Sequence, residues 1–187
     1  ADHVIYGLPS LMDAGATTGR AAEAAATEVA LVSLGGVGPL SGASSLQMQN
    51  NLCDGEPLAD LRQRAFCSGT LIEPKLVLTA ADCVDKHSLG GFVATWGWDA
   101  DDDLPLSPAT YRVISEVVFR DDLMDVAILE LAAQADLGAV ALARPFPGAA
   151  TASPAFVPSH PLGVATKVDT DAAVVADPAS AQRLLVR

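Results

Sequence analysis

The sequence contains few aromatic residues and no long apolar run. Aromatic residues make up 5% of the 187 residues, whereas 50% are hydrophobic because alanine and valine are abundant. A chain this rich in apolar residues is not a disordered one, and its small side chains suit short strands and loops. No apolar stretch approaches the roughly 20 residues of a membrane-spanning helix, so we expect no membrane segment.

Basic residues are also scarce. The chain has 11 Lys and Arg residues against 23 Asp and Glu residues, which gives a formal net charge of -12. A surface this acidic repels the phosphate backbone of nucleic acids and the surface of anionic membranes. We therefore expect neither nucleic acid nor a membrane among the partners.

Only three cysteines are present, at positions 53, 67 and 83. An odd number leaves one thiol free, or paired with a cysteine of another chain, if the other two form a disulfide. The alternative is three buried and unreactive thiols.

Strand signals are short and closely spaced. A buried strand is expected at 29–34, before Gly35-Gly36, and residues 20–28 form either one short helix or a loop. Further strands are expected at 68–72, 76–79, 92–96, 111–119 and 126–131, and two more near 155–157 and 166–175. Short strands separated by turns indicate an all-β barrel or sandwich.

The most specific motif runs from Cys67 to Cys83. It reads Cys-Ser-Gly-Thr-Leu-Ile-Glu-Pro-Lys-Leu-Val-Leu-Thr-Ala-Ala-Asp-Cys. This motif resembles the first-barrel hairpin of trypsin-like peptidases, in which Cys-Ser-Gly and a variable turn precede Val-Leu-Thr-Ala-Ala-His-Cys. The resemblance implies a Cys67–Cys83 disulfide that closes a loop of about 15 residues. Such a bond implies an oxidising compartment, so we expect a secreted or periplasmic protein.

Asp82 occupies the position of the family's catalytic histidine. Histidine accepts the serine proton because its pKa lies near neutrality, whereas an exposed aspartate, with a pKa of about 3.9, is a far weaker base. A second motif, Asp-Val-Ala-Ile-Leu-Glu-Leu, begins at Asp125 and resembles the strand whose aspartate orients that histidine. The resemblance therefore assigns Asp82 and Asp125 to the catalytic positions. Taken alone, Asp125 is equally an ordinary turn residue at the start of a strand.

A third motif, Ser159-His160-Pro161-Leu162-Gly163 followed by Lys167, resembles the Gly-His-Pro-x-Gly segment of secreted bacterial peptidases of the glutamyl-endopeptidase-like branch. Val4-Ile5-Tyr6-Gly7 and Asn51-Leu52-Cys53 resemble the same branch. We expect none of the three histidines to replace the missing base. His160 is expected in a turn, His87 in a solvated loop, and His3 near the amino terminus.

The family's nucleophile lies in a Gly-Asn/Asp-Ser-Gly motif, which the 187 residues do not contain. Ser41-Gly42 and Ser68-Gly69 lack its context. The oxyanion hole depends on backbone amides around that serine. We therefore expect no nucleophile, no metal and no cofactor in this chain, which would be inactive by itself.

The resemblance predicts an all-β, chymotrypsin-like double barrel with the first barrel complete and the second only begun. We divide the chain into an amino-terminal segment with one strand that joins the barrel (1–50), the first barrel (51–131), a connector (132–152) and the first strands of the second barrel (153–187). A second polypeptide, or a carboxy-terminal segment cleaved after Arg187, is expected to complete the second barrel. Cys53 either bonds to that segment or is buried.

Three functions fit these observations. The first is a degenerate serine peptidase, a pseudoenzyme or an inactivated form, with a binding or regulatory role and a protein or peptide ligand. The second is part of a working serine endopeptidase whose serine lies on another chain and in which Asp82 is an engineered or unusual replacement. The third is a carbohydrate- or protein-binding β-domain unrelated to peptidases.

Overall fold

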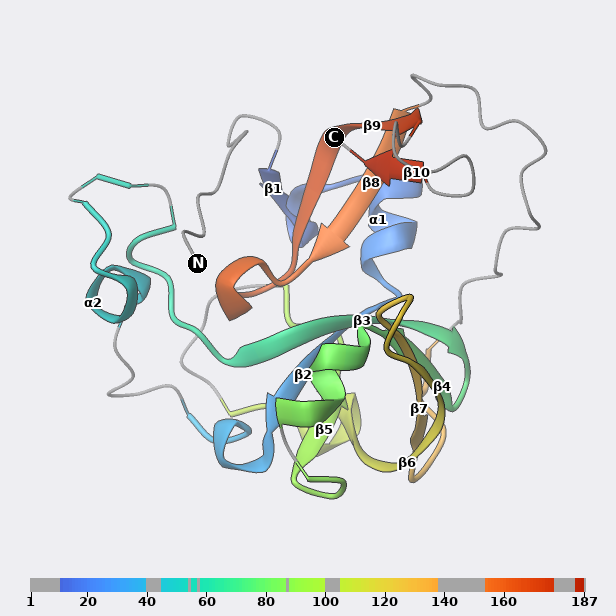
Figure 1. Cartoon of the computed structure of the whole chain (residues 1–187). Coiled ribbons are helices and arrows are strands. Elements are labelled where there is room, and N and C mark those ends of the chain that lie inside the picture. Colours follow the sequence, from blue (N-terminus) through green and yellow to red (C-terminus); the bar gives the residue numbers. More distant parts are fainter. Residues whose placement is uncertain are drawn as a thin grey trace.

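The computed structural model describes residues 11–39, 45–53, 55–56, 58–86, 88–99, 105–137, 154–176 and 184–186. These residues form a closed six-stranded barrel beside a four-stranded antiparallel sheet (Figure 1). The predicted all-β, chymotrypsin-like fold is confirmed, with a complete first barrel and an incomplete second one.

The closed barrel is antiparallel throughout and has the strand order β2-β3-β4-β7-β6-β5. Its strands are β2 (Glu28–Ser33), β3 (Ala65–Glu73), β4 (Leu76–Thr79), β5 (Phe92–Thr95), β6 (Tyr111–Asp121) and β7 (Val126–Leu131). β4 and β7 begin and end at the predicted residues, and β3 begins three residues before the predicted start. Pairing of β5 with β2 closes the barrel.

The pattern of buried residues shows which faces of the barrel strands are packed against other parts of the chain. In β7 every second side chain is buried, as expected for a strand with one face toward a core. In β2 both faces are buried. Val29 and Leu31 belong to the barrel core, whereas Ala30 and Val32 pack in a second cluster that includes Trp98. The outer face of β2 is therefore covered by other parts of the chain.

The second sheet is built around β9. Its strands are β1 (Leu11–Asp13), β8 (Pro154–Ser159), β9 (Lys167–Ala176) and β10 (Leu184–Val186). β1, β8 and β10 all pair with β9. The two strands predicted near 155–157 and 166–175 are present as β8 and β9, and the sheet has two further strands, β1 and β10, that the sequence did not predict. β1 was missed because its three residues show no periodicity and pair with β9 about 150 positions later.

Helices are short. The α-helices are α1 (Gly19–Ala25) and α2 (Leu46–Asn50), and the 3₁₀-helices are η2 (Ala14–Ala16), η3 (Leu34–Gly36), η4 (Ala81–Lys86), η5 (Pro108–Thr110) and η6 (Pro161–Gly163). Of the two alternatives for residues 20–28, the helix is confirmed, but it ends at Ala25 because Glu28 already belongs to β2. In the described part of the chain, no helix is long and apolar enough to cross a membrane.

Turn η6 connects the second sheet to the barrel. The amide of Arg64 donates to the Gly163 carbonyl at 2.8 Å, and the amide of Thr166 donates to the Trp98 carbonyl at 2.9 Å. Gly163 has a φ of 77°, and a Cβ atom there would lie 2.0 Å from the Ala65 carbonyl oxygen. Only glycine fits this left-handed position and this close approach.

Several predictions concern residues outside the described ranges. They include His3, His87, Ser41, Val4, Arg187 and most of the connector. The division of the chain into four parts also remains a prediction.

Candidate functional site

The site predicted from the hairpin motif lies where β4 ends and η4 begins. Asp82 is exposed and occupies the first turn of η4. The Cys67–Cys83 disulfide joins β3 to η4, with a Cα–Cα distance of 6.0 Å. The disulfide that the family resemblance implied is therefore present, and it holds η4 beside the start of the hairpin.

Asp125 lies in the turn between β6 and β7. Its φ of 52° is left-handed, a conformation that aspartate tolerates better than most residues. Its Oδ1 atom accepts a hydrogen bond from the backbone amide of Asp82, at 3.2 Å. The structure thus brings together the two residues that the resemblance assigned to the catalytic positions, and it leaves both carboxylates exposed.

A salt bridge between Arg120 and Asp85 also connects β6 to η4. The guanidinium of Arg120, on β6, donates to both carboxylate oxygens of Asp85, on η4, at 2.6 and 2.7 Å. Its Nε donates to Asp122 at 2.6 Å. The hydrogen bond from Arg120 lowers the pKa of Asp85. Sequence reasoning missed this contact, because the run of charges at 120–122 predicts a solvated turn but no partner on η4.

The disulfide decides whether this region can offer a metal site. Ligand atoms of Cys67, Asp82 and Cys83 lie within 4.8 Å of one another. Because the two sulfur atoms are bonded to each other, neither is available as a thiolate, which is the form that binds metals. Asp82 is then the remaining ligand of the three.

His160 lies after β8, between the barrel and the second sheet. The side chain is 6% exposed and stacks on Trp98, with ring centroids 5.6 Å apart. Its Nδ1 atom lies 3.0 Å from the Val164 carbonyl oxygen. Because a carbonyl only accepts, Nδ1 carries the proton, and the buried Nε2 is the unprotonated nitrogen. Burial lowers the pKa of His160 to about 4, so the ring is a neutral turn residue, as predicted.

Glu28 is a buried acidic residue that sequence reasoning missed. It is 4% exposed, and burial raises its pKa to about 8, although hydrogen bonds from Thr70 and Ser68 lower it in part. Ser68 also accepts a hydrogen bond from the His160 amide at 2.9 Å. Ser68 therefore belongs to the packed interface between barrel and second sheet. The one available signal for Glu28 was an acidic residue directly before a buried apolar run.

Cys53 is exposed and forms no disulfide within the described residues. The alternative in which Cys53 is a small buried residue is therefore wrong.

Comparison with known proteins is consistent with this geometry. Residues 67–183 match the trypsin-like peptidase domain family. The structure is similar to the VesB protease of Vibrio cholerae, with a TM-score of 0.56 and 22% identity, over 86% of this chain and 44% of that one. This likeness shows the fold, and the chain spans less than half the length of VesB.

Two further structures are more distant. The secreted serine protease VesC of Vibrio cholerae has a TM-score of 0.48 and 19% identity, over 80% of this chain and 29% of that one. Human heparin binding protein has a TM-score of 0.48 and 18% identity, over 81% of this chain and 61% of that one. No curated protein sequence matches the chain. Since the family match covers more than half of its residues, the chain belongs to the trypsin-like peptidase domain family.

Proposed function

We propose that this chain is a trypsin-like serine peptidase homologue that does not hydrolyse peptides by itself and serves in binding or regulation. The observation that carries the proposal is the residue at position 82. Asp82 directly precedes Cys83, and its amide donates a hydrogen bond to the Asp125 carboxylate. By the resemblance of the hairpin motif, this is the position at which the family has its catalytic histidine. A carboxylate there cannot replace the imidazole as the base that activates a serine.

Among the residues that the structure describes, none offers a substitute for this base. His160 is buried, and its protonated nitrogen is engaged by the Val164 carbonyl. The 187 residues contain no Gly-Asn/Asp-Ser-Gly sequence. Ser68 is occupied in the interface with the second sheet.

Active-site labelling tests the proposal. The purified chain is treated with a fluorophosphonate probe beside active trypsin as a positive control, and intact mass is measured. We expect no labelling of the chain or of its Asp82→His variant, because the variant restores a base but supplies no serine. Stoichiometric labelling of any serine in this chain would contradict the proposal.

A working endopeptidase is the second candidate, and the open second sheet favours it. Its four described strands do not close, in contrast to the six strands of the barrel. We propose that another polypeptide, or a downstream segment, completes the second barrel, carries the serine and bonds to the exposed Cys53. In this candidate, Asp82 is an engineered or unusual replacement, and a histidine codon at this position of the native gene would favour the engineered one.

Intact mass of the protein from its natural source, with and without reductant, tests this candidate. A companion polypeptide that is released only by reductant and is labelled by the fluorophosphonate supports it. A single folded, monomeric 19.1 kDa species that reductant leaves unchanged rejects both the link and the second polypeptide.

We further propose a secreted or periplasmic location and membership of the glutamyl-endopeptidase-like branch. The disulfide supports the location because such bonds persist in oxidising compartments. The turn at His160 and Gly163 supports the branch, because it explains physically why the motif needs glycine. Fractionation of the source cells tests the location, and recovery of the disulfide-bonded protein from the cytoplasm would reject it.

A further inference from the structure

Glu28 is a buried acid on the outer face of β2. It pairs with Thr70 of β3, and directly paired residues on neighbouring strands point to the same face of a sheet. Val29, the next residue, belongs to the barrel core, so Glu28 points to the opposite face. Because side chains of the barrel itself fill the inner face, β8 of the second sheet packs against β2 on the outer one. Glu28 therefore lies on the interface face of the barrel, where it is 4% exposed.

One serine connects Glu28 to the second sheet. Ser68 pairs with Ala30 on the same face of the barrel, and its side chain is hydrogen-bonded to Glu28. The Ser68 hydroxyl also accepts a hydrogen bond from the backbone amide of His160 at 2.9 Å. Thr70 donates to Oε2 of Glu28 at 3.4 Å. The carboxyl group of Glu28 is thus linked through Ser68 to the backbone of the turn that follows β8.

No cation balances this carboxyl group. In the described part of the chain Glu28 forms no ion pair. The strands β3, β5 and β8 pack against β2, and their one charged side chain is Glu73, which is exposed. Burying an unpaired carboxylate is costly, so burial raises the pKa of Glu28 to about 8, and the hydrogen bonds from Thr70 and Ser68 offset only part of this effect.

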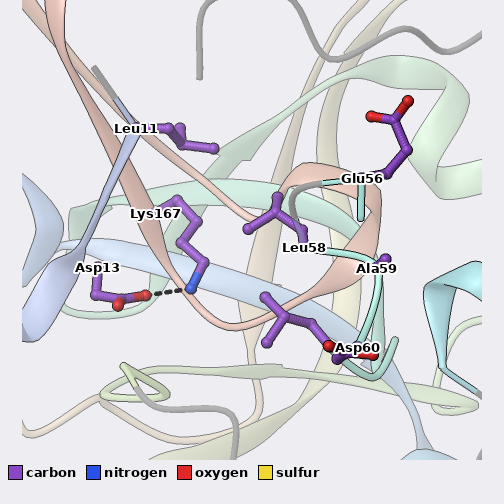
Figure 2. Close-up of a pocket in the computed structure, with 8 residues that line it drawn as sticks. Leu11, Asp13, Glu56, Leu58, Ala59, Asp60 and Lys167 are labelled. Carbon is purple, nitrogen blue, oxygen red and sulfur yellow. Dashed lines mark hydrogen bonds and ion pairs between the residues drawn. The ribbon is translucent and has the colours of Figure 1, made fainter. Parts of the chain in front are cut away.

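The cationic groups of the second sheet and its surroundings have other partners. Lys167 of β9 lines the cavity of Figure 2, where its ammonium is bonded to the Asp13 carboxylate. The guanidinium of Arg64, six positions before Thr70, lies over the Trp98 ring. The other titratable side chains of α1 and β9, the elements that pack against β8, are Arg20, Glu23, Asp169 and Asp171. The fold therefore accommodates Glu28 as a neutral acid.

We propose that Glu28 is a pH-sensitive contact that holds the second sheet against the barrel while it is protonated. When Glu28 ionises, its carboxylate requires water, and β8 and the turn at His160 separate from β2 and β3 to admit it. The barrel itself stays closed, because its core side chains point to the opposite face. This contact does not involve Asp82 or Asp125, so it holds for a pseudoenzyme and for a working peptidase alike.

The direction of the effect follows from proton linkage. Opening of the interface exposes Glu28, and its pKa returns from about 8 to its ordinary value of 4.5. Between these two values the opened form has released a proton that the closed form keeps, so opening becomes more favourable by up to about tenfold per pH unit. Below this interval both forms are protonated, and above it both are ionised, so the dependence on pH disappears.

Amide hydrogen exchange of the ¹⁵N-labelled chain, followed by NMR at several low urea concentrations, tests the proposal. The amides of Arg64, His160 and Thr166 report on the interface, because each donates across it. The amides of β4 and β7 report on the barrel. The wild type is compared with Glu28→Gln at the same pH, so the intrinsic rate of exchange and the titration of His160 cancel. Glu116→Gln, which removes an exposed carboxylate of β6, is the matched control.

We expect the interface amides to exchange faster than the barrel amides and with little dependence on urea, as in a local opening. Their exchange in the wild type, relative to Glu28→Gln, should rise about tenfold between about pH 6 and pH 7 and become constant above about pH 8. A ratio that does not change with pH would overturn the proposal. The same urea dependence for interface and barrel amides would also overturn it, because the second sheet would then separate only when the whole chain unfolds.

Ser68→Ala tests the link itself. This variant removes the acceptor of the His160 amide but leaves Glu28 buried, so the interface should open about tenfold more often at every pH and keep its dependence on pH. Ser115→Ala, which removes an exposed serine of β6, is the matched control and should exchange as the wild type does. Unchanged exchange at Arg64 and Thr166 in Ser68→Ala would reject Ser68 as the link.

Discussion

The backbone amide of Asp82 donates a hydrogen bond to the Asp125 carboxylate at 3.2 Å, across 43 positions of the sequence. Because the donor is a main-chain group, this contact does not depend on which side chain follows Ala81. The contact therefore holds the start of η4 beside the turn between β6 and β7 whatever the residue at position 82. It also makes Asp125 a stabilising residue, whether or not the chain is catalytic.

Two replacements of Asp125 test its contribution to stability, both as a hydrogen-bond acceptor and as a residue that tolerates a left-handed backbone. Asp125→Ala removes the acceptor for the Asp82 amide and places alanine at a φ of 52°, so we expect a loss of about 2 kcal/mol in the free energy of unfolding. Asp125→Asn keeps an oxygen acceptor and tolerates the left-handed backbone, so it should remain close to the wild type. Urea unfolding, monitored by the fluorescence of the buried Trp96 and Trp98, measures both variants. Equal stability of the alanine variant and the wild type would show that the contact contributes nothing.

Removal of the disulfide should lower the free energy of unfolding more than the replacement of Asp125 does. The bond joins Cys67 and Cys83, which are 16 positions apart, so Cys67→Ala/Cys83→Ala should lower the free energy of unfolding by about 3 kcal/mol. Cys53→Ser is the matched control, because Cys53 is exposed and free, and it should change stability little. Thermal unfolding under non-reducing conditions measures the difference. A double variant as stable as the Cys53 variant would contradict the expectation.

Stability should fall as the pH rises, because Glu28 is held protonated in the fold. Its pKa is raised from its ordinary value of 4.5 to about 8. The stabilisation is complete below pH 4.5 and is lost as the pH rises through about 8, by at most about 1.4 kcal/mol per pH unit. Glu28→Gln cannot ionise, so its free energy of unfolding should depend less on pH than that of the wild type.

Urea unfolding of both proteins between pH 6.5 and pH 8.5, about the range in which Glu28 ionises in the fold, measures this difference. The range avoids the opposite effect of His160, whose pKa is lowered from 6.5 to about 4 in the fold. As the pH falls through that interval the unfolded chain takes up a proton that the folded chain does not, so stability is lost. Glu116→Gln, which removes an exposed carboxylate, is the control and should keep the slope of the wild type. Parallel curves for Glu28→Gln and the wild type would contradict the assignment.

Gly163→Ala should weaken the attachment of the second sheet to the barrel. The new Cβ would lie 2.0 Å from the Ala65 carbonyl oxygen, at a φ of 77°, so backbone must move. We expect a loss of about 2 kcal/mol or more in the free energy of unfolding. Gly15→Ala, with no atom within 4 Å of its new Cβ, is the control and should change stability little. Equal stability of the two alanine variants would show that η6 moves freely.

Local sequence determined much of the first barrel. β4 and β7 were predicted at their observed bounds because each is a short apolar run with a clear boundary residue at its ends. The pairing of Cys67 with Cys83 followed from the resemblance of the hairpin, whose two strands bring their outer ends together. Asp82 and Asp125 were assigned by the same resemblance, and their contact was found where it placed them.

Tertiary structure alone decided the features that depend on distant partners. β1 exists because three residues without periodicity find β9, and the charge of Lys167 is buried because Asp13 comes with that strand. Glu28 and His160 have shifted pKa values because the folded chain buries both side chains and removes water from them. His160 stacks on Trp98 and its amide bonds Ser68, 92 positions away, and Glu28 bonds Thr70, 42 positions away. Burial among residues so distant in the chain leaves no local pattern of hydrophobicity, so these properties could not be derived from the sequence.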